Sequence, residues 1–213
     1  TRNFAHEPAM TLEQAERALI LGKEFAESEI AAGSNLLAFG EMGIGNSSSA
    51  AAILAALSDA PVATCVGLGT GIDETQLAKK IALVTQAIVR IKDKSPLNIL
   101  CEVGGFEIAQ ICGAMLATAQ AGRLIVVDGF IVTSAALLAV HINPHARDYM
   151  IFAHQSEEAG HQLMLRMLDA KPLLNLGMRL GEGTGAALAL PLIQAAVSFY
   201  NQMATFESAG VKV

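Results

Sequence analysis

The chain has 213 residues, of which 53% are hydrophobic and 16% charged, and its formal net charge is −6. This length suits one good-sized domain, or one domain with a small appendage. The high apolar content and the 19 glycines are typical of a globular α/β protein and exclude a largely disordered chain. The acidic balance, without any run of Lys or Arg, argues against nucleic-acid binding. Any phosphate partner would be small and contacted locally.

The cysteines, the N-terminus and the apolar runs indicate where in the cell the protein is expected. Cys65, Cys101 and Cys112 lie in apolar stretches without a CxxC motif, so we expect buried free thiols and a cytoplasmic location. The polar start Thr1-Arg2-Asn3 predicts no signal peptide, and the missing initial Met predicts a fragment, a processed chain or a shortened form. Apolar runs such as residues 131–142 are short, so no membrane span is expected.

Apolar runs, polar turns and helical periodicity alternate along the chain. Thr11 and Gln14 form a capping-box pattern at the start of the first expected helix. Helices are predicted over residues 12–31, 50–57, 74–92, 97–102, 106–121, 131–140, 157–169 and 185–203. Strands are predicted over residues 36–40, 62–66, 124–127 and 150–153. The repeated order of strand, turn and helix predicts an α/β fold with a parallel sheet and helices on its faces.

Polar residues and glycines follow the predicted strands. Ligands bind at the carboxyl ends of the strands in such sheets. Glu41, the turn 67–71, Asp128 and Ser156 all fall at predicted strand ends, and Glu182 lies in a turn before the last helix. We therefore expect these residues to share one site.

The glycine turns at 40–45 and 67–71 do not fit the common nucleotide motifs. Neither contains the Gly-Lys-Ser/Thr of a Walker A loop, and neither has the third glycine of GxGxxG. Backbone N–H groups in these turns could hold a single phosphate, but tight turns between strand and helix explain them equally. Lys80 follows the second turn and either reaches back to a phosphate or forms a solvated pair with Lys79.

The segment 179–186, RLGEGTGA, places Glu182 in a glycine-rich turn ahead of a long apolar helix. Glycines let the backbone approach a ligand, and a helix start offers free N–H groups to an anion. Glu182 is then either a base above a phosphate ester or an acid that caps the helix. With Glu41 it forms a pair of acids that suggests proton transfer without naming a reaction.

Two histidine pairs raise the question of a metal site. Pro144 interrupts the pair His141 and His145, and no Cys or acid stands at ligand spacing around His154 and His161. We therefore predict no metal. The chain also has no GxSxG elbow for a serine nucleophile.

Taken together, the motifs resemble one family, that of nicotinate-nucleotide–dimethylbenzimidazole phosphoribosyltransferase (CobT) in cobalamin biosynthesis. The resemblance runs over essentially the whole chain, ending with MATFESAG at residues 203–210. Five ordered motifs carry it: FGEMGIGN at 39–46, VGLGTG at 66–71, VGGF at 103–106, VDGFI at 127–131 and RLGEGTGA at 179–186.

The resemblance implies a Rossmann-like parallel sheet with helices on both faces and a small helical domain built from the chain ends. It places residues 1–32 and 186–213 in the small domain and residues 33–185 in the core. It also implies a homodimer in which each active site is completed by the neighbour. No cofactor is implied.

The implied reaction moves phosphoribose from nicotinate mononucleotide to dimethylbenzimidazole, with inversion, and gives α-ribazole 5′-phosphate and nicotinate. Glu182 matches the family's catalytic acid and would accept the azole proton, with Glu41 as a second acid. The residues expected to line the phosphoribosyl site are Gly43, Gly69, Lys80, Asp128, Ser156, Gly181 and Gly183. Because nicotinate leaves as a neutral ring and no diphosphate departs, neither a strong acid nor Mg²⁺ is demanded.

Members of this family carry about a further third of chain before the point that matches Thr1. That portion supplies much of the benzimidazole pocket. We therefore expect weak or no activity from this chain alone, unless a partner chain supplies the rest. The alternative is a nucleotide-binding subunit without turnover.

Overall fold

The computed structural model describes residues 1–69, 71 and 73–210, so Thr70 of the second glycine turn and the last three residues of the tail lie outside it. The helices are α1 (Leu12–Ala31), α2 (Ser47–Leu57), α3 (Val62–Cys65), α4 (Glu74–Arg90), α5 (Pro96–Val103), α6 (Phe106–Gln120), α7 (Phe130–Ile142), the 3-10 helix η1 (Pro144–Tyr149), α8 (His161–Met167) and α9 (Thr184–Gln202). The strands are β1 (Leu36–Phe39), β2 (Leu124–Val127), β3 (Met150–Phe152), β4 (His154–Ser156) and β5 (Leu174–Met178).

The strands form two short parallel sheets that meet at Ala153. β1, β2 and β3 pair in that order, and β4 pairs with β5. Ala153 links the two sheets, because its N–H donates to the Val127 carbonyl at 2.8 Å and its own carbonyl accepts from the Leu174 N–H at 3.0 Å. The α/β class and the parallel sheet are thus confirmed.

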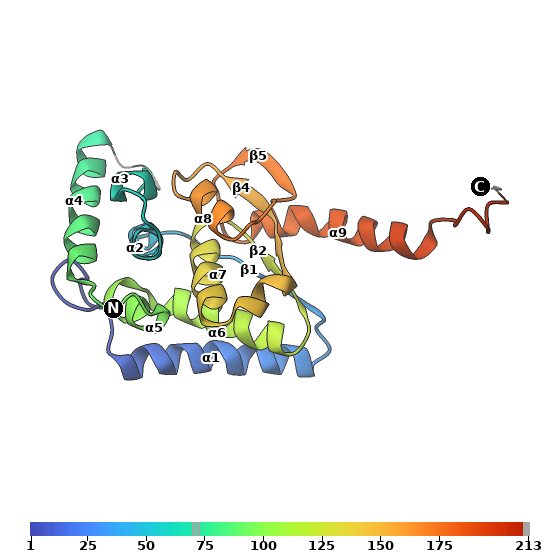
Figure 1. Cartoon of the computed structure of the whole chain (residues 1–213), viewed down its shortest axis with the longest axis horizontal. Helices are drawn as coiled ribbons and strands as arrows, with labels where there is room; N and C mark the ends of the chain where they lie inside the picture. Colours follow the sequence, from blue (N-terminus) through green and yellow to red (C-terminus); the bar gives the residue numbers. More distant parts are fainter. Residues whose placement is uncertain (70, 72, 211–213) are drawn as a thin grey trace.

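Helices cover the sheet on both faces, and successive side chains of β2 point to opposite faces. Ile125 and Val127 point into the main core formed with α2, α5, α6 and α7. Val126 points the other way and packs with Ala186 and Ala189 of α9. Beyond its first turns α9 projects from the body and leads to the C-terminus (Figure 1). The division into helical ends and core stays a prediction.

Helix α1 lies along α6 at the base of the molecule (Figure 1). Each helix has a glycine where the backbones meet: a Cβ on Gly22 would lie 1.8 Å from the Gln110 carbonyl oxygen, and one on Gly113 would lie 2.0 Å from that of Leu19. The Thr11–Gln14 capping box is present at the start of α1. The predicted helix over 12–31 is confirmed to the residue.

One predicted element is wrong, and another is shorter than predicted. The segment 62–66 is the helical turn α3 and not a strand. Pro61 starts the turn, and the Thr64 hydroxyl donates to the Pro61 carbonyl at 2.8 Å, so a local bond overrides the β-propensity of Val and Thr. The helix predicted over 157–169 shortens to α8, because Gly160 is its N-cap and the preceding residues form a turn.

Strands β4 and β5 were missed by the sequence reading. β5 contains Asn175 and Gly177, two residues that are depleted in strands. It exists because its backbone pairs with β4, in a register that runs from His154 with Leu174 to Ser156 with Met178. Among the described residues, no helix has the length and apolar character to cross a membrane.

Candidate functional site

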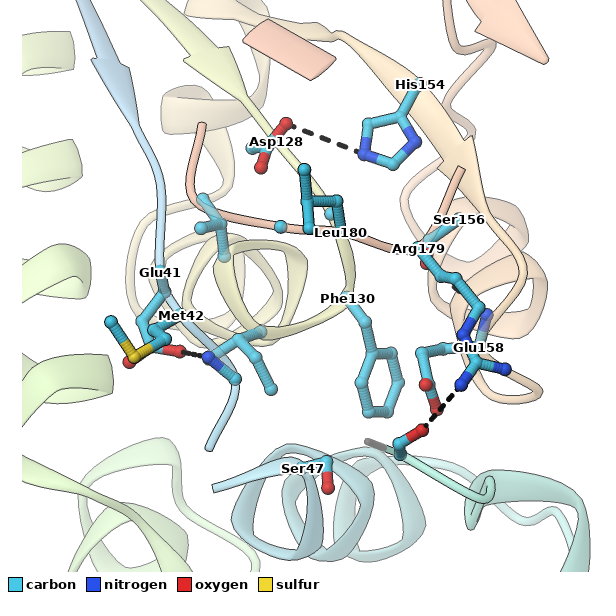
Figure 2. A pocket seen from close by; sticks show the side chains of 16 residues that line it. Glu41, Met42, Ser47, Asp128, Phe130, His154, Ser156, Glu158, Arg179 and Leu180 are labelled. Carbon is cyan, nitrogen blue, oxygen red and sulfur yellow. Dashed lines mark hydrogen bonds and ion pairs between the residues drawn. The ribbon is translucent and has the colours of Figure 1, made fainter. Parts of the chain in front are cut away.

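A small pocket opens where the strands end and several helices begin (Figure 2). The described residues that line it are Glu41, Met42, Gly43, Ser47, Gly69, Asp128, Gly129, Phe130, Ile131, Val132, His154, Ser156, Glu158, Arg179, Leu180 and Gly181. The structure therefore brings the turns after β1, β2 and β4 together with the segment before α9.

Two helix starts face this pocket without a side-chain cap. Helix α2 begins at Ser47 after Asn46, and α7 begins at Phe130 after Gly129, and neither cap residue bonds the first turn through its side chain. Ser47 and the whole first turn of α7 line the pocket. Free N–H groups and the positive end of the helix dipole make such a place receptive to an anion such as phosphate.

Asp128 follows β2 and caps a helix that begins 55 residues later in the chain. Its Oδ2 accepts from the Gly183 N–H at 3.0 Å, and its Oδ1 accepts from the Ala186 N–H at 3.0 Å. Burial by itself raises the pKa of Asp128, but the His154 ring and the N–H groups of Ala186 and Gly129 outweigh it, and the pKa falls below its ordinary value. A buried carboxylate thus stabilises the start of α9.

The loop that carries Glu182 rests on the turn after β1. The Glu182 N–H donates to the Glu41 carbonyl at 2.8 Å, and Glu182 adopts a left-handed φ of 59°. The backbones touch so closely that a Cβ on Gly40 would lie 2.2 Å from the Gly183 nitrogen. The two acids of the predicted pair are therefore joined through their backbones.

Their side chains are placed differently. The Glu41 carboxylate lines the pocket and accepts from the Gly43 N–H (Figure 2). The Glu182 side chain is exposed, and it is Leu180 and Gly181 of this loop, not Glu182, that line the pocket. The catalytic roles of both acids stay predictions.

Lys80 lies behind the pocket wall and not on it. Its Nζ donates to the Ser47 Oγ and to the Gly67 carbonyl, both at 3.0 Å. Burial lowers the pKa of Lys80, while the charge of Glu158 acts in the opposite direction. Of the predicted phosphoribosyl-site residues, Gly43, Gly69, Asp128, Ser156 and Gly181 line the pocket, whereas Lys80 and Gly183 stand one layer behind.

Sequence reasoning missed several lining residues, among them Ser47, Glu158 and Arg179. Arg179 donates from Nη2 to the Gly69 carbonyl at 3.1 Å and so connects the β5 side to the second glycine turn (Figure 2). Glu158 has a buried Oε2 without a hydrogen-bond partner among the described residues. The three serines at 47–49 after the first glycine turn were a usable signal for Ser47, and Arg179 opens the RLGEGTGA motif, whereas Glu158 gave no signal.

Both histidines of the β4 region, His154 and His161, are buried, and His154 lines the pocket. His161 is fully occupied: its Nδ1 accepts from the Ser156 N–H at 2.7 Å, and its Nε2 lies 2.9 Å from the Thr133 Oγ1. Since Nδ1 is an acceptor, Nε2 carries the proton and donates to Thr133. Among the described residues no group of three metal-ligating side chains forms.

The fold and the pocket define an α/β protein with a pocket at the carboxyl edge of its parallel sheet, where two helix starts suit an anionic ligand. Comparison with known proteins narrows this class. A family model described as "DBI_PRT: Phosphoribosyltransferase" matches residues 1–211. The chain therefore belongs to this phosphoribosyltransferase family.

Individual relatives agree with the family. The chain is 58% identical to the nicotinate-nucleotide–dimethylbenzimidazole phosphoribosyltransferase of Vibrio vulnificus over all 213 residues, which cover 62% of that protein. It is 59% identical to the enzyme of the same name from Shewanella oneidensis over 208 residues, 97% of this chain and 59% of that protein. The crystal structure of CobT from Thermus thermophilus superposes with a TM-score of 0.95 at 48% identity, over 100% of this chain and 64% of that one.

Proposed function

We propose that the chain transfers phosphoribose from nicotinate mononucleotide to dimethylbenzimidazole, the reaction after which its relatives are named. The observation that carries the proposal is the Glu182 loop, which is held by Asp128 and by the Glu41 carbonyl next to a pocket with two uncapped helix starts. The first feature offers a base, and the second offers a seat for the phosphate.

The chemistry suits these groups. One ring nitrogen of the benzimidazole forms a bond to the anomeric carbon, while the bond from that carbon to the nicotinate nitrogen breaks and its electron pair stays on nicotinate. The other benzimidazole nitrogen then loses its proton to a carboxylate, for which we propose Glu182 with help from Glu41. The products are α-ribazole 5′-phosphate and nicotinate.

The phosphoribosyl group is proposed to lie over the strand ends. The turns at Gly43 and Gly69 and the start of α2 would receive the phosphate. The Lys80 ammonium behind Ser47 adds positive charge there, since it reaches Ser47 at 3.0 Å. Ser156 and the loop at Gly181 and Gly183 would flank the ribose.

A second candidate is nucleotide binding without turnover. One observation favours it: the Glu182 side chain is exposed. The chain spans about 62% of the length of the curated relatives that it matches. In that case another chain would complete the benzimidazole site. Binding and turnover must therefore be measured separately.

The test is product analysis by mass spectrometry with nicotinate mononucleotide and dimethylbenzimidazole, beside calorimetric titration of nicotinate mononucleotide alone. Loss of a general base costs about 10²–10⁴ in rate, so Glu182→Gln should lower product formation by that factor and leave nucleotide affinity nearly unchanged. Glu29→Gln, an exposed acid on α1, is the matched control. Equal rates for Glu182→Gln and the parent would show that Glu182 is not the base, and binding without product would favour the second candidate.

We further propose a cytoplasmic homodimer. Leu192, Phe199 and Tyr200 of α9 are 48%, 71% and 88% exposed, which is unusual for such residues and supports a partner along the projecting helix. The three cysteines are free and buried, as in a reducing compartment. Light scattering after size exclusion should give twice the chain mass, and Phe199→Glu with Tyr200→Glu should give the monomer.

A further inference from the structure

We propose that His154 is a positioning residue, which orients the Asp128 carboxylate toward the start of α9 and so fixes the loop that presents Glu182. The catalytic consequence of this arrangement rests on the function proposed above. The structural part does not, because it follows from contacts between β2, β4 and the first turn of α9.

The His154 ring is buried beside the Asp128 carboxylate. It is 1% exposed, and its Nε2 lies 3.5 Å from the Asp128 Oδ1 (Figure 2). Neither ring nitrogen has a hydrogen-bond partner among the described residues. Since a buried polar group without a partner is costly, the approach to the carboxylate is the feature that compensates the burial.

Both oxygens of the Asp128 carboxylate accept hydrogen bonds, so the orientation of this carboxylate matters. Oδ2 receives the Gly183 N–H and Oδ1 the Ala186 N–H, each at 3.0 Å. Gly183 is the N-cap of α9 and has no side chain of its own with which to cap. The helix start therefore depends on a carboxylate from β2, and a donor behind that carboxylate sets its direction.

The first turn of α9 also packs directly against the His154 ring. A Cβ on Gly185 would lie 2.0 Å from the His154 Cδ2 and 2.6 Å from the Asp128 Oδ1. On its other side the ring stands 6.2 Å, between centroids, from His161, whose own nitrogens are engaged by Ser156 and Thr133. His154 thus fills a gap between a fixed imidazole and the helix that follows Glu182.

These contacts assign a tautomer. Asp128 is ionised and would attract an Nε2–H across the 3.5 Å between them, so we infer that the hydrogen of the His154 ring lies on Nε2. A ring that loses this hydrogen would present a lone pair to the carboxylate. The two would repel, and Asp128 would release the Gly183 and Ala186 N–H groups.

Amide hydrogen exchange tests the inference without any assay of turnover. In His154→Leu, which lacks a donor, we expect the Gly183 and Ala186 amides to exchange about tenfold faster or more, as for a helix that loses its cap. In His154→Gln, which keeps an N–H donor, the increase should be smaller. The exposed His145→Gln is the matched control and should leave both amides unchanged. Unchanged amides in a folded His154→Leu would overturn the proposal.

The parent protein supplies a second test in case His154→Leu does not fold. Nitrogen NMR of the histidine ring should show the hydrogen on Nε2, and a hydrogen on Nδ1 alone would overturn the proposal. Where the parent turns over substrate, His154→Leu should lower kcat about tenfold while KM for nicotinate mononucleotide stays within about twofold. An inactive parent would favour nucleotide binding without turnover and leave the exchange test standing.

Discussion

His161 should make the stability of the protein fall in mild acid. Burial is the main cause that lowers the pKa of His161 from 6.5 to about 3, with a further contribution from nearby His154. The unfolded chain therefore binds a proton at a pH where the folded protein does not. The stability is fully present above pH 6.5 and decreases as the pH falls toward 3, by about 1.4 kcal/mol per pH unit.

The size of the effect at one pH follows from these two values. At pH 5 the protonated form of the unfolded histidine exceeds the neutral form about 30-fold. The free energy of unfolding is therefore about 2 kcal/mol lower than at pH 7. For a chain of this length that corresponds to about 4–8 °C in Tm. The proton cannot enter the folded ring cheaply, because Nδ1 accepts from Ser156 and Nε2 faces Thr133.

The assay is urea unfolding of the parent and of His161→Gln at pH 7 and pH 5. Gln can serve Ser156 and Thr133 but does not titrate, so the variant should lack about 2 kcal/mol of the loss between the two pH values. Asp128 and His154, the titratable groups that face His161, are present in both proteins. His145→Gln should behave as the parent. If parent and His161→Gln lose the same stability, His161 is not held neutral by burial and the reasoning is refuted.

Two other substitutions test the packing and the site. Gly22→Ala should lower the free energy of unfolding by about 1–3 kcal/mol, because the new Cβ would lie 1.8 Å from the Gln110 carbonyl oxygen. Urea unfolding measures this change, and Glu29→Ala at an exposed position is the control. Lys80→Met should weaken binding of nicotinate mononucleotide by about tenfold in calorimetry, since it removes the cation behind Ser47, and Lys79→Met should not; equal affinities for both variants would remove Lys80 from the phosphate site.

The sequence predicted best what depends on neighbours along the chain. The helix over 12–31 has its cap and its periodicity within the segment, and the strand over 124–127 is a run of four apolar residues, three of them buried, with a turn after it. The segment 62–66 has similar composition but follows Pro61, whose carbonyl receives local bonds. β5 is a strand only because β4 lies beside it.

The same division holds for the site. The rule that ligands bind at strand ends grouped Glu41, Asp128 and Ser156, and all three line one pocket in the structure. It could not show that Asp128 caps a helix 55 residues away, or that Lys80 bonds Ser47 behind the wall. Those contacts depend on how the elements pack, and no spacing in the sequence records them.

The glycines around Glu182 allow the close backbone contacts that fix the position of this acid. Gly181 adopts a φ of 79°, and a Cβ there would lie 2.7 Å from the Glu41 carbonyl oxygen, so the loop can reach the turn after β1 only with glycine at this position. Gly185 is required for another reason, the ring of His154 beneath it. Between them Glu182 takes a left-handed conformation that an acid rarely adopts. Such strain persists where the surrounding contacts overdetermine it. Here those contacts come from β1 and β2, the two strands whose ends also form the pocket.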